Sequence, residues 1–303
     1  MGEKKTAYPK PFLKWVGGKS QIIDDIMKHF PSEINNYHEI FLGGGSVLFA
    51  LLYLRENHKI TIDGSIKAYD ANPALIHLYK CVQNDNGLLF EMVTKYRNEY
   101  DSIEGTSVNR KPKCYNEGKT SKESYYYWVR SEYNNTIKTT SEAAAMFLFL
   151  NKTCFRGLYR EGPNGFNVPY GHYKRTPSIV TRDDLNSLSK LIQDVVFECC
   201  DFSDSLNHIT KGDFVYLAPP YAPTDATSFV SYTNGGFDVN CHKRLFSKIK
   251  QLHSEHIKFS MSNAKVELVT ECFEGLDVHD IVAKRAINSK NPGSTVTEVI
   301  VSN

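Results

Sequence analysis

The sequence lacks several features that would assign it to a class at once. Its 303 residues contain no apolar run near the roughly 20 residues of a membrane-spanning helix. The opening stretch MGEKKTAYPK has no apolar signal core. We therefore expect an intracellular protein, cytoplasmic or wherever its target lies, with no membrane partner. The seven cysteines form no CxxC pair, which argues against a disulfide framework and a metal site.

Two nucleotide-binding fingerprints are also missing. No GxxxxGK[ST] occurs, and WVGGKS at 15–20 lacks the first glycine of that loop, which disfavours a nucleoside triphosphatase. The GxGxxG motif of nicotinamide enzymes is incomplete: Gly43 and Gly45 match its first two glycines, but Leu48 occupies the position of the third. An NAD-type oxidoreductase remains an alternative that calorimetry with the cofactor would test.

The net charge of +2 is small, but the charge is unevenly distributed. The segment from Val108 to Arg182 holds thirteen Lys/Arg against five Glu, a net +8, together with thirteen aromatic residues. Positive charge interleaved with stacking rings suits a nucleic acid. A solvated basic face over an aromatic core would have the same composition, so charge alone does not separate the two interpretations.

Hydrophobic periodicity predicts alternating strands and helices, interrupted by a polar, basic and mainly helical stretch at 84–151. With 41% hydrophobic residues the chain can bury a large core. The pattern indicates an α/β fold, with a mostly parallel Rossmann-like sheet, helices on both faces and an inserted module. Expected strands are 37–41, 66–69, 195–199, 214–217, 257–261, 278–282 and 296–301, and expected helices include 21–30, 47–55, one from Asn72-Pro73, and 240–253.

A glycine-rich turn and an acid follow two of these strands. Gly43, Gly44 and Gly45 come directly after the strand at 37–41, where they let the backbone turn tightly and approach a ligand. Asp70 ends the next strand, where a carboxylate can accept hydrogen bonds from a ribose diol. Together they suggest a cofactor that contains a nucleoside.

Seven blocks now carry a specific resemblance: KWVGGKS at 14–20, EIFLGGGSVLF at 39–49, YDANPAL at 69–75, FLNKTCFRGLYR at 149–160, FNVPYG at 166–171, CDF at 200–202 and APPY at 218–221. In this order they resemble the Dam-like, alpha-class DNA adenine-N6 methyltransferases. The resemblance implies a catalytic S-adenosylmethionine domain at 1–82 and 176–303, and a target-recognition DNA-binding insert at 83–175. It also implies double-stranded DNA as partner and S-adenosylhomocysteine as product.

The resemblance implies roles for individual residues around the cofactor. Lys19 is expected near the methionine carboxylate, Asp70 at the ribose hydroxyls, and Asp201 with Phe202 at the adenine. By themselves, Lys19 would be a surface lysine at a helix start and Asp201 a helix N-cap before Ser203. The implied cofactor residues are Trp15, Lys19, Phe41, Gly43, Gly44, Gly45, Asp70, Asp201 and Phe202.

The family's catalytic motif is Asp-Pro-Pro-Tyr, which corresponds here to Ala218, Pro219, Pro220 and Tyr221. An exocyclic adenine amine is a poor nucleophile and is inaccessible inside a duplex, so the base must be flipped out and stacked on an aromatic ring. The aspartate and the first proline's carbonyl would accept the amine's hydrogen bonds, and the tyrosine would supply the ring. Proline stiffens the loop and has no N–H to compete for these carbonyls.

Ala218 has no acceptor, and it is neither the Ser nor the Asn of related amino-methyltransferases. Losing one such acceptor is worth about 3 to 4 kcal/mol, or roughly 10² to 10³ in rate. The hypothesis is an inactivated form, with an engineered substitution favoured over a naturally inactive homologue. A protein that binds DNA and S-adenosylmethionine without catalysis is the alternative.

Similarity implies that CFRGLYR and FNVPYG form a β-hairpin that enters DNA, with GATC, or a site containing it, as the guessed target. Phe155 would wedge at the vacated base, unless it and Leu158 pack in a hairpin core. Arg156 departs from an expected asparagine. The implied DNA-binding residues are Lys14, Phe155, Arg156, Leu158, Arg160, Asn167 and Pro169.

Further expectations concern the C-terminal third of the chain, its partners and its oligomeric state. Residues 228–237 fit a loop that closes near the target base, and 290–301 a closing hairpin of structural importance. Ser262-Asn263 should end a strand at the ligand-binding edge of the sheet. A companion restriction endonuclease acting on the same site is a further expected partner, and the chain is expected to be a monomer or a weak dimer.

Overall fold

The computed structural model describes residues 6–222, 236–284 and 295–303. The chain divides into two compact units, each of which is described by itself. Unit 1 comprises residues 1–9, 19–71 and 194–303, and unit 2 comprises residues 10–18 and 72–193.

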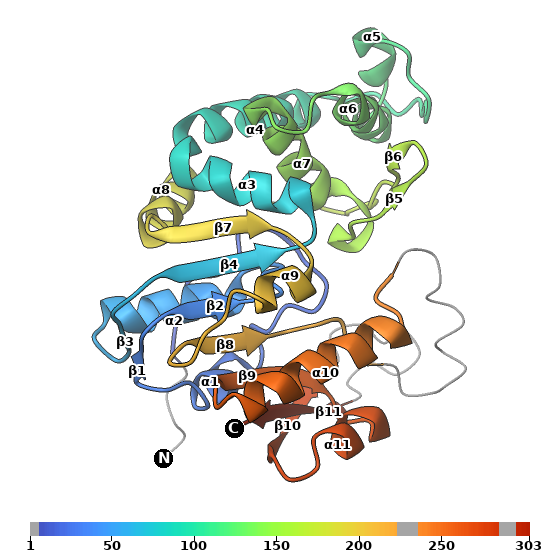
Figure 1. Ribbon diagram of the computed structural model, residues 1–303. Helices are drawn as coiled ribbons and strands as arrows, with labels where there is room; N and C mark the ends of the chain where they lie inside the picture. The colour runs from blue at the N-terminus through green and yellow to red at the C-terminus, as the bar shows by residue number, and fades with distance from the viewer. Residues whose placement is uncertain (1–5, 223–235, 285–294) are drawn as a thin grey trace. The chain divides into compact units, whose positions relative to one another are not determined.

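Unit 1 is built on a seven-stranded sheet with the order β10-β11-β9-β8-β2-β4-β7 (Figure 1). Strands β9, β8, β2, β4 and β7 pair in parallel, and β11 is antiparallel to both of its neighbours. The mostly parallel sheet predicted from the sequence is therefore confirmed. The strands are β2 (Tyr37–Glu39), β4 (Ile66–Asp70), β7 (Val195–Cys199), β8 (Phe214–Leu217), β9 (Lys258–Ala264), β10 (Asp277–Lys284) and β11 (Thr295–Ser302), with β1 (Glu33–Ile34) and β3 (Thr61–Ile62) forming a separate parallel pair.

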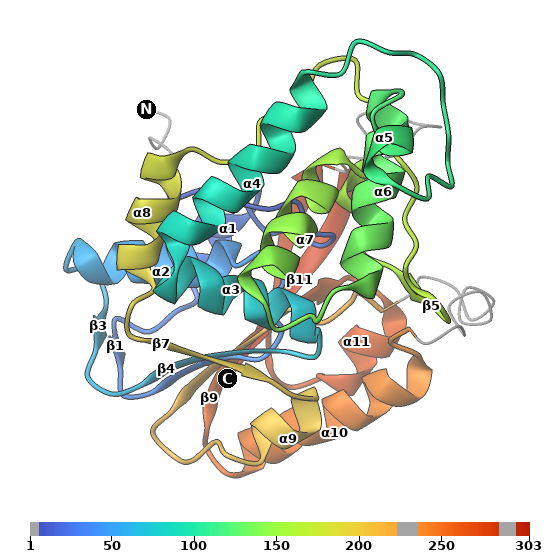
Figure 2. The same cartoon turned by 90° about the horizontal axis from the view of Figure 1, so that it is seen from above.

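Helices cover both faces of this sheet. Figures 1 and 2 agree in placing α1 and α2 on one face and α9, α10 and α11 on the other. Because both faces are covered, the central strand β8 is buried along its whole length, which explains its unbroken apolar sequence FVYL. The helices are α1 (Ile23–Met27), α2 (Ser46–Glu56), α9 (Phe202–Leu206), α10 (Val239–Ser254) and α11 (Glu267–Cys272).

Unit 2 is mainly helical, as predicted for 84–151. Helix α7 packs against α3, α4 and α6, and its residues 143–151 are all buried (Figure 2). Asn72 caps α3 by accepting from Leu75 N at 3.1 Å, and Pro73 occupies the first turn, as the sequence predicts. The elements are α3 (Pro73–Asn84), α4 (Asn86–Asp101), α5 (Tyr115–Gly118), α6 (Lys122–Asn135), α7 (Ser141–Thr153), the 3₁₀ helix η1 (Phe155–Gly157), β5 (Glu161–Gly162), β6 (Gly165–Phe166) and α8 (Arg182–Leu191).

Some expected elements differ in extent. The hairpin consists only of β5 and β6, because CFRGLYR begins as the turn η1 and not as a strand. Arg156 has φ 56° and Gly157 has φ 65°, both left-handed values that an extended strand does not allow. The helix expected at 21–30 is the shorter α1. Across the part of the chain that the structure describes, no helix combines the length and apolarity needed to cross a membrane.

A buried polar network at the start of β2 gives a test of this fold. Asp213 Oδ2 lies 3.3 Å from His38 Nε2, and its carboxylate also accepts from Asn36 Nδ2 and Thr210 N. Asp213→Asn places an amide N–H₂ against these donors, so we expect it to lower the free energy of unfolding by about 1 to 3 kcal/mol. Urea denaturation measures this loss.

The matched control is Asp194→Asn, which weakens the exposed pair of Asp194 with Arg55. Exposed pairs contribute little, so we expect a loss below about 1 kcal/mol. Equal losses in the two variants would contradict the importance of the buried network.

Candidate active site

Four motifs of unit 1 lie at one edge of its sheet. The glycine turn follows β2, Asp70 ends β4, Asp201 follows β7, and Ala218 follows β8. These strands are parallel, so their carboxyl ends meet at the same edge, where ligands bind in such sheets. Gly43 N donates to Asp70 Oδ2 at 3.0 Å, which orients the carboxylate beside the turn.

The glycine turn has the backbone geometry expected from its sequence. Gly43 has φ 52° and Gly45 has φ 75°, and these left-handed conformations disfavour residues with a side chain. Gly45 is the N-cap of α2, and its N–H donates to Leu42 O at 3.0 Å. Gly44 between them is buried. The turn therefore brings bare backbone and the start of an eleven-residue helix to the carboxyl edge.

An aromatic cluster lies beside Asp201. The rings of Phe41, Phe202 and Phe237 have centroids 5.5 to 5.8 Å apart. Asp201 caps α9 by accepting from Ser203 N at 2.9 Å, so the helix-cap geometry expected from the sequence is present. Its carboxylate also pairs with Arg244 at 3.2 Å.

Arg244 was missed by the sequence reasoning. Its guanidinium lies 4.6 Å from the centre of the Phe202 ring, so it contacts both residues of the expected adenine subsite. In the sequence it reads as one more polar residue of the amphipathic helix α10. Only the packing of α10 near α9 identifies it.

Lys19 is buried, with 5% of its surface exposed, so the surface-lysine interpretation is wrong. The backbone N–H of Lys19 donates to Ser46 Oγ at 3.2 Å, and its side-chain amine lies 4.3 Å from the centre of the Tyr221 ring. Burial lowers the pKa of Lys19 to about 8, although the negative charge of Glu298 opposes this shift.

The motif at 14–20 is divided between the units. Lys19 belongs to unit 1, whereas Lys14 and Trp15 belong to unit 2. Within unit 2, the Trp15 ring lies 5.8 Å from that of Tyr159 and 6.5 Å from that of Phe147. Trp15 is thus packed among aromatic side chains of the expected target-recognition region.

Strands β9 and β11 hold the loop at 218–222. Ala222 N donates to Asn263 Oδ1 at 3.1 Å, and the Tyr221 hydroxyl donates to Glu298 Oε2. Burial and the charge of Glu298 raise the pKa of Tyr221 well above its ordinary value. Ala218 and Tyr221 are half-buried, Pro219 is buried and Pro220 is exposed. Sequence reasoning missed Glu298, which reads there as an ordinary strand residue.

The two motifs expected to contact DNA lie side by side in unit 2. Phe155 N donates to Pro169 O at 2.8 Å, and Arg160 Nε donates to Asn167 Oδ1 at 2.7 Å. Phe155 is 40% exposed, which argues against the core-packing interpretation for this side chain. Leu158 is half-buried, while Arg156, Arg160, Asn167 and Pro169 are exposed.

Asn151 ties Lys14 to the same region. It exchanges hydrogen bonds with the Lys14 backbone at 2.8 and 2.7 Å, and its amide donates to Gly157 O. The Lys14 amine lies 4.3 Å from the centre of the Tyr173 ring. Burial and the charge of Lys14 lower the pKa of the neighbouring Lys152 to about 8.

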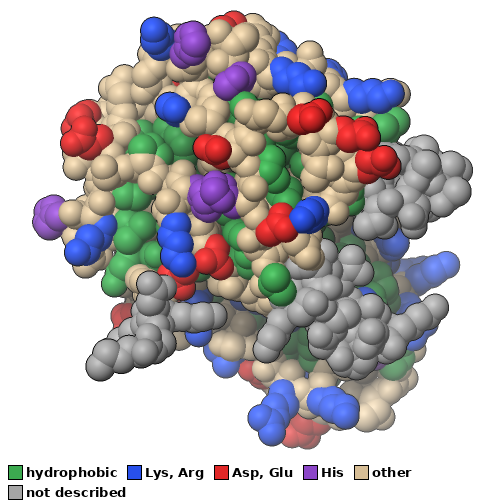
Figure 3. All heavy atoms as spheres, turned by 90° about the horizontal axis from the view of Figure 1, so that it is seen from below, with side chains coloured by type: hydrophobic (Ala, Val, Ile, Leu, Met, Phe, Trp, Pro, Cys, Tyr) green, Lys and Arg blue, Asp and Glu red, His purple; other side chains and the backbone are tan. Residues whose placement is uncertain are grey.

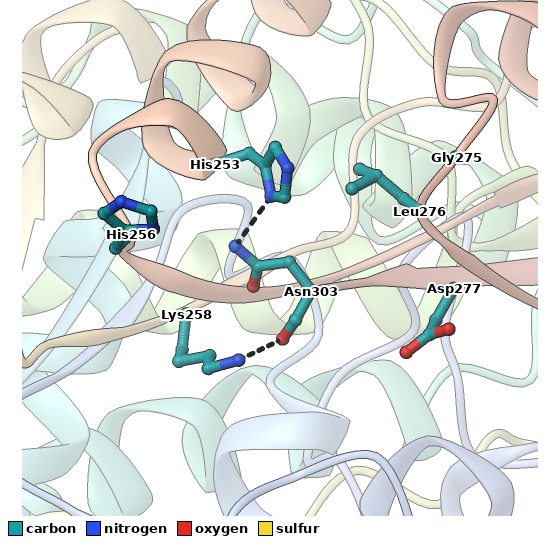
Figure 4. Close-up of a pocket in the computed structure, with 7 residues that line it drawn as sticks. All are labelled: His253, His256, Lys258, Gly275, Leu276, Asp277 and Asn303. Carbon is teal, nitrogen blue, oxygen red and sulfur yellow. Dashed lines mark hydrogen bonds between the residues drawn. The ribbon is translucent and has the colours of Figure 1, made fainter.

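A pocket of about 310 Å³ occupies a different part of unit 1. It lies where β9 and β10 begin, the opposite edge from the four motifs, because β9 and β10 run in the same direction. Figure 4 shows His253 and Lys258 each bonded to Asn303 at its rim. In the view of Figure 3, described acidic and basic side chains are interspersed, with histidines among them. Neither the pocket nor the face seen in Figure 3 has the concentrated positive charge of a surface that binds nucleic acid.

The expected target-base loop at 228–237 lies outside the described residues except for Gly236 and Phe237. Of the expected closing hairpin at 290–301, residues 295–301 belong to β11, which pairs with β10.

Comparison with known proteins gives consistent matches along the chain. The family described as "D12 class N6 adenine-specific DNA methyltransferase" matches residues 15–287. The type II methyltransferase M.MjaIII of Methanocaldococcus jannaschii is 38% identical over 291 residues, covering 93% of each chain. The type II methyltransferase M1.LlaDCHI of Lactococcus lactis is 32% identical, covering 97% of this chain and 95% of its own. The DNA adenine methylase of Haemophilus influenzae is 30% identical, covering 97% and 94%.

The buried Lys19 and the half-buried Lys152 give a prediction for the site and its surroundings. We expect Lys19 and Lys152 to titrate with a pKa of about 8, because burial disfavours their charged forms. Carbon NMR of ε-labelled lysine measures this, and Lys19→Arg and Lys152→Arg identify the two signals. Titration of both near the ordinary 10.5 would show that the amines are solvated.

The same pKa shifts determine whether the free energy of unfolding rises or falls with pH. Because folding lowers both pKa values, the folded state binds fewer protons than the unfolded chain between about pH 8 and 10.5. These two groups should therefore make the free energy of unfolding rise with pH across that window.

Proposed function

Because this chain belongs to the D12 class of N6 adenine-specific DNA methyltransferases, we propose that its site is built to transfer methyl from S-adenosylmethionine to a flipped adenine in double-stranded DNA. The products would be N6-methyladenine and S-adenosylhomocysteine. The observation that carries the proposal is the meeting of the glycine turn, Asp70, Asp201 and the 218–221 loop at one sheet edge.

The residues at this edge fit a nucleoside cofactor. The bare backbone of Gly43 to Gly45 allows close approach, and Asp70 presents its carboxylate next to that turn. The rings of Phe41 and Phe202, with Asp201 and Arg244, offer apolar surface and polar groups for an adenine. Bound S-adenosylmethionine would supply an electrophilic methyl group on its sulfonium.

The 218–221 loop would present the target amine. In the proposal, Tyr221 stacks on the flipped base, and the carbonyl of Pro219 accepts one hydrogen bond from its amino group. Lys19, Asn263 and Glu298 surround this loop from three other segments. Fixing the amine in line with the methyl group is a proximity effect, which needs a rigid loop.

Ala218 limits what the chain can catalyse. It lies at the end of β8, where the family's aspartate would accept the second hydrogen bond. The site can then hold the base but lacks a side-chain acceptor at this position. We propose an impaired form of the enzyme, and the non-catalytic DNA- and cofactor-binding protein is the alternative that the same alanine favours.

The insert at 83–175 is proposed to recognise DNA. Its exposed Phe155 and Arg160 both lie on the 149–160 motif, which backbone hydrogen bonds join to the 166–171 motif, on a helical scaffold around α7. Two relatives are named type II methyltransferases. A companion restriction endonuclease stays a prediction, as does the choice between monomer and weak dimer.

Restoring the acceptor tests the catalytic assignment. We expect Ala218→Asp to raise the rate of methyl transfer into DNA by roughly 10² to 10³, because one aimed acceptor stabilises the transition state by about 3 to 4 kcal/mol. Incorporation of labelled methyl groups, followed by sequencing of the methylated DNA, gives the rate and the target site.

The control is Ala218→Val, which adds bulk without an acceptor and should give no gain. An Ala218→Asp protein that binds DNA and S-adenosylmethionine but transfers no methyl group would favour the non-catalytic alternative.

Arg160 tests the recognition assignment. We expect Arg160→Ala in the Ala218→Asp protein to reduce discrimination against sites altered at one base pair by about 1 to 3 kcal/mol, because a bidentate arginine contact is lost. Competition binding with single-base variants of the mapped site measures this. Arg175→Ala, which removes the same charge outside the two motifs, is the control and should weaken all sites equally.

A further inference from the structure

Glu298 lies beside the 218–221 loop although its strand, β11, is distant in the sequence. The Tyr221 hydroxyl donates to Glu298 Oε2 across a separation of 77 residues. Resting on the function proposed above, we propose that Glu298 is a positioning residue, which fixes the ring of Tyr221 in the orientation that stacks on the target adenine.

A carboxylate is well suited to hold a tyrosine ring. A hydrogen bond to an ionised acceptor is roughly twice as strong as one between neutral groups. Anchoring the hydroxyl restrains rotation about the Cα–Cβ bond, because that rotation would move the far end of the ring away from Glu298. The phenolic O–H prefers to lie in the ring plane, so a fixed acceptor also favours one orientation of that plane. The tyrosine is thus held at its tip by β11, while its backbone continues from β8.

The backbone next to Tyr221 is anchored on the neighbouring strand. Ala222 N donates to Asn263 Oδ1, and Asn263 is paired with Val299, the residue after Glu298. The two anchors therefore come from adjacent positions of one antiparallel strand pair. A rigid sheet can hold both ends of this segment, whereas a loop alone cannot.

Lys19 completes the arrangement around the ring. Its amine lies 4.3 Å from the ring centre, so it covers one face by a cation–π contact. A ring has two faces, and the base would stack on the other. Glu298 raises the pKa of Lys19 against the effect of burial, which favours the charged form that this contact needs. One carboxylate therefore serves both partners of the contact.

A purely structural role for Glu298 is the rival explanation, and the fold offers a matched control. Tyr216 on β8 also has a buried hydroxyl, which lies 2.7 Å from Ser262 Oγ on β9. The two hydroxyls of this pair bond to each other in the same region of the sheet. Tyr216→Phe therefore removes a buried tyrosine hydrogen bond while it keeps the hydrogen bond between Tyr221 and Glu298.

The contact itself is tested in the protein as it exists. With tyrosine labelled at the ring carbon that bears the hydroxyl, the NMR signal lost in Tyr221→Phe identifies Tyr221. We expect Glu298→Gln to shift that signal, because a neutral amide holds the hydroxyl less firmly than a carboxylate does. Tyr216→Phe should leave the Tyr221 signal unchanged. An unaltered Tyr221 signal in Glu298→Gln would overturn the proposal.

The consequence for catalysis is tested in the Ala218→Asp background. We expect Glu298→Gln to lower the single-turnover rate of methyl transfer about tenfold, with the dissociation constant for S-adenosylmethionine within about twofold. The double variant Glu298→Gln/Tyr221→Phe should have the same rate of methyl transfer as Tyr221→Phe alone, because Glu298 acts through the Tyr221 hydroxyl. Tyr216→Phe should lower the melting temperature but leave the rate of methyl transfer unchanged.

The outcomes separate the two proposals. If Ala218→Asp transfers methyl and Glu298→Gln leaves the rate unchanged, the positioning role is refuted and the proposed function stands. If Ala218→Asp neither binds S-adenosylmethionine nor methylates DNA, the proposed function fails. The catalytic purpose of Glu298 then fails with it, whatever the NMR signal shows.

Discussion

The parallel pairing of β7, β4, β2 and β8 is the constraint on which the candidate site depends. Parallel strands all end at the same edge, so four segments far apart in the sequence deliver a glycine turn, two carboxylates and the 218–221 loop to one place. The sheet is covered by helices on both faces, which leaves that edge for ligands. Chemistry can then vary in the loops while the sheet supplies stability.

Burial of ionisable groups accompanies this arrangement. Lys19 is desolvated next to Tyr221 and Glu298, and Glu39 on β2 is buried just before the glycine turn. Burial raises the pKa of Glu39 to about 8, although the Tyr37 hydroxyl donates to its carboxylate at 2.8 Å. Such groups lower the stability of the fold, and their concentration near the carboxyl edge is typical of functional sites.

Regular elements were well predicted because their cause is local. Residues 195–199 and 214–217 are strands with the predicted bounds, and Asn72-Pro73 starts a helix by capping chemistry that the sequence states directly. The turn at Phe155 was mispredicted as strand. The chain on the N-terminal side of the left-handed Arg156 is bonded to the 166–171 motif, through Phe155 N to Pro169 O and Gly171 N to Thr153 O. Propensity does not report such long-range restraints.

The sequence by itself determined the alternation of strands and helices, the glycine turn, the order of the family's motifs and the missing acceptor at Ala218. These are properties of neighbouring residues or of residue identity. Only the tertiary structure decided that Lys19 is buried, that Arg244 contacts Asp201 and Phe202, and that Glu298 holds Tyr221. The contacts of Arg244 and Glu298 join residues 42 to 77 positions apart, and the contact of Lys19 with Tyr221 joins residues 202 positions apart. The pairing and packing of the sheet set them, and no local pattern encodes that geometry.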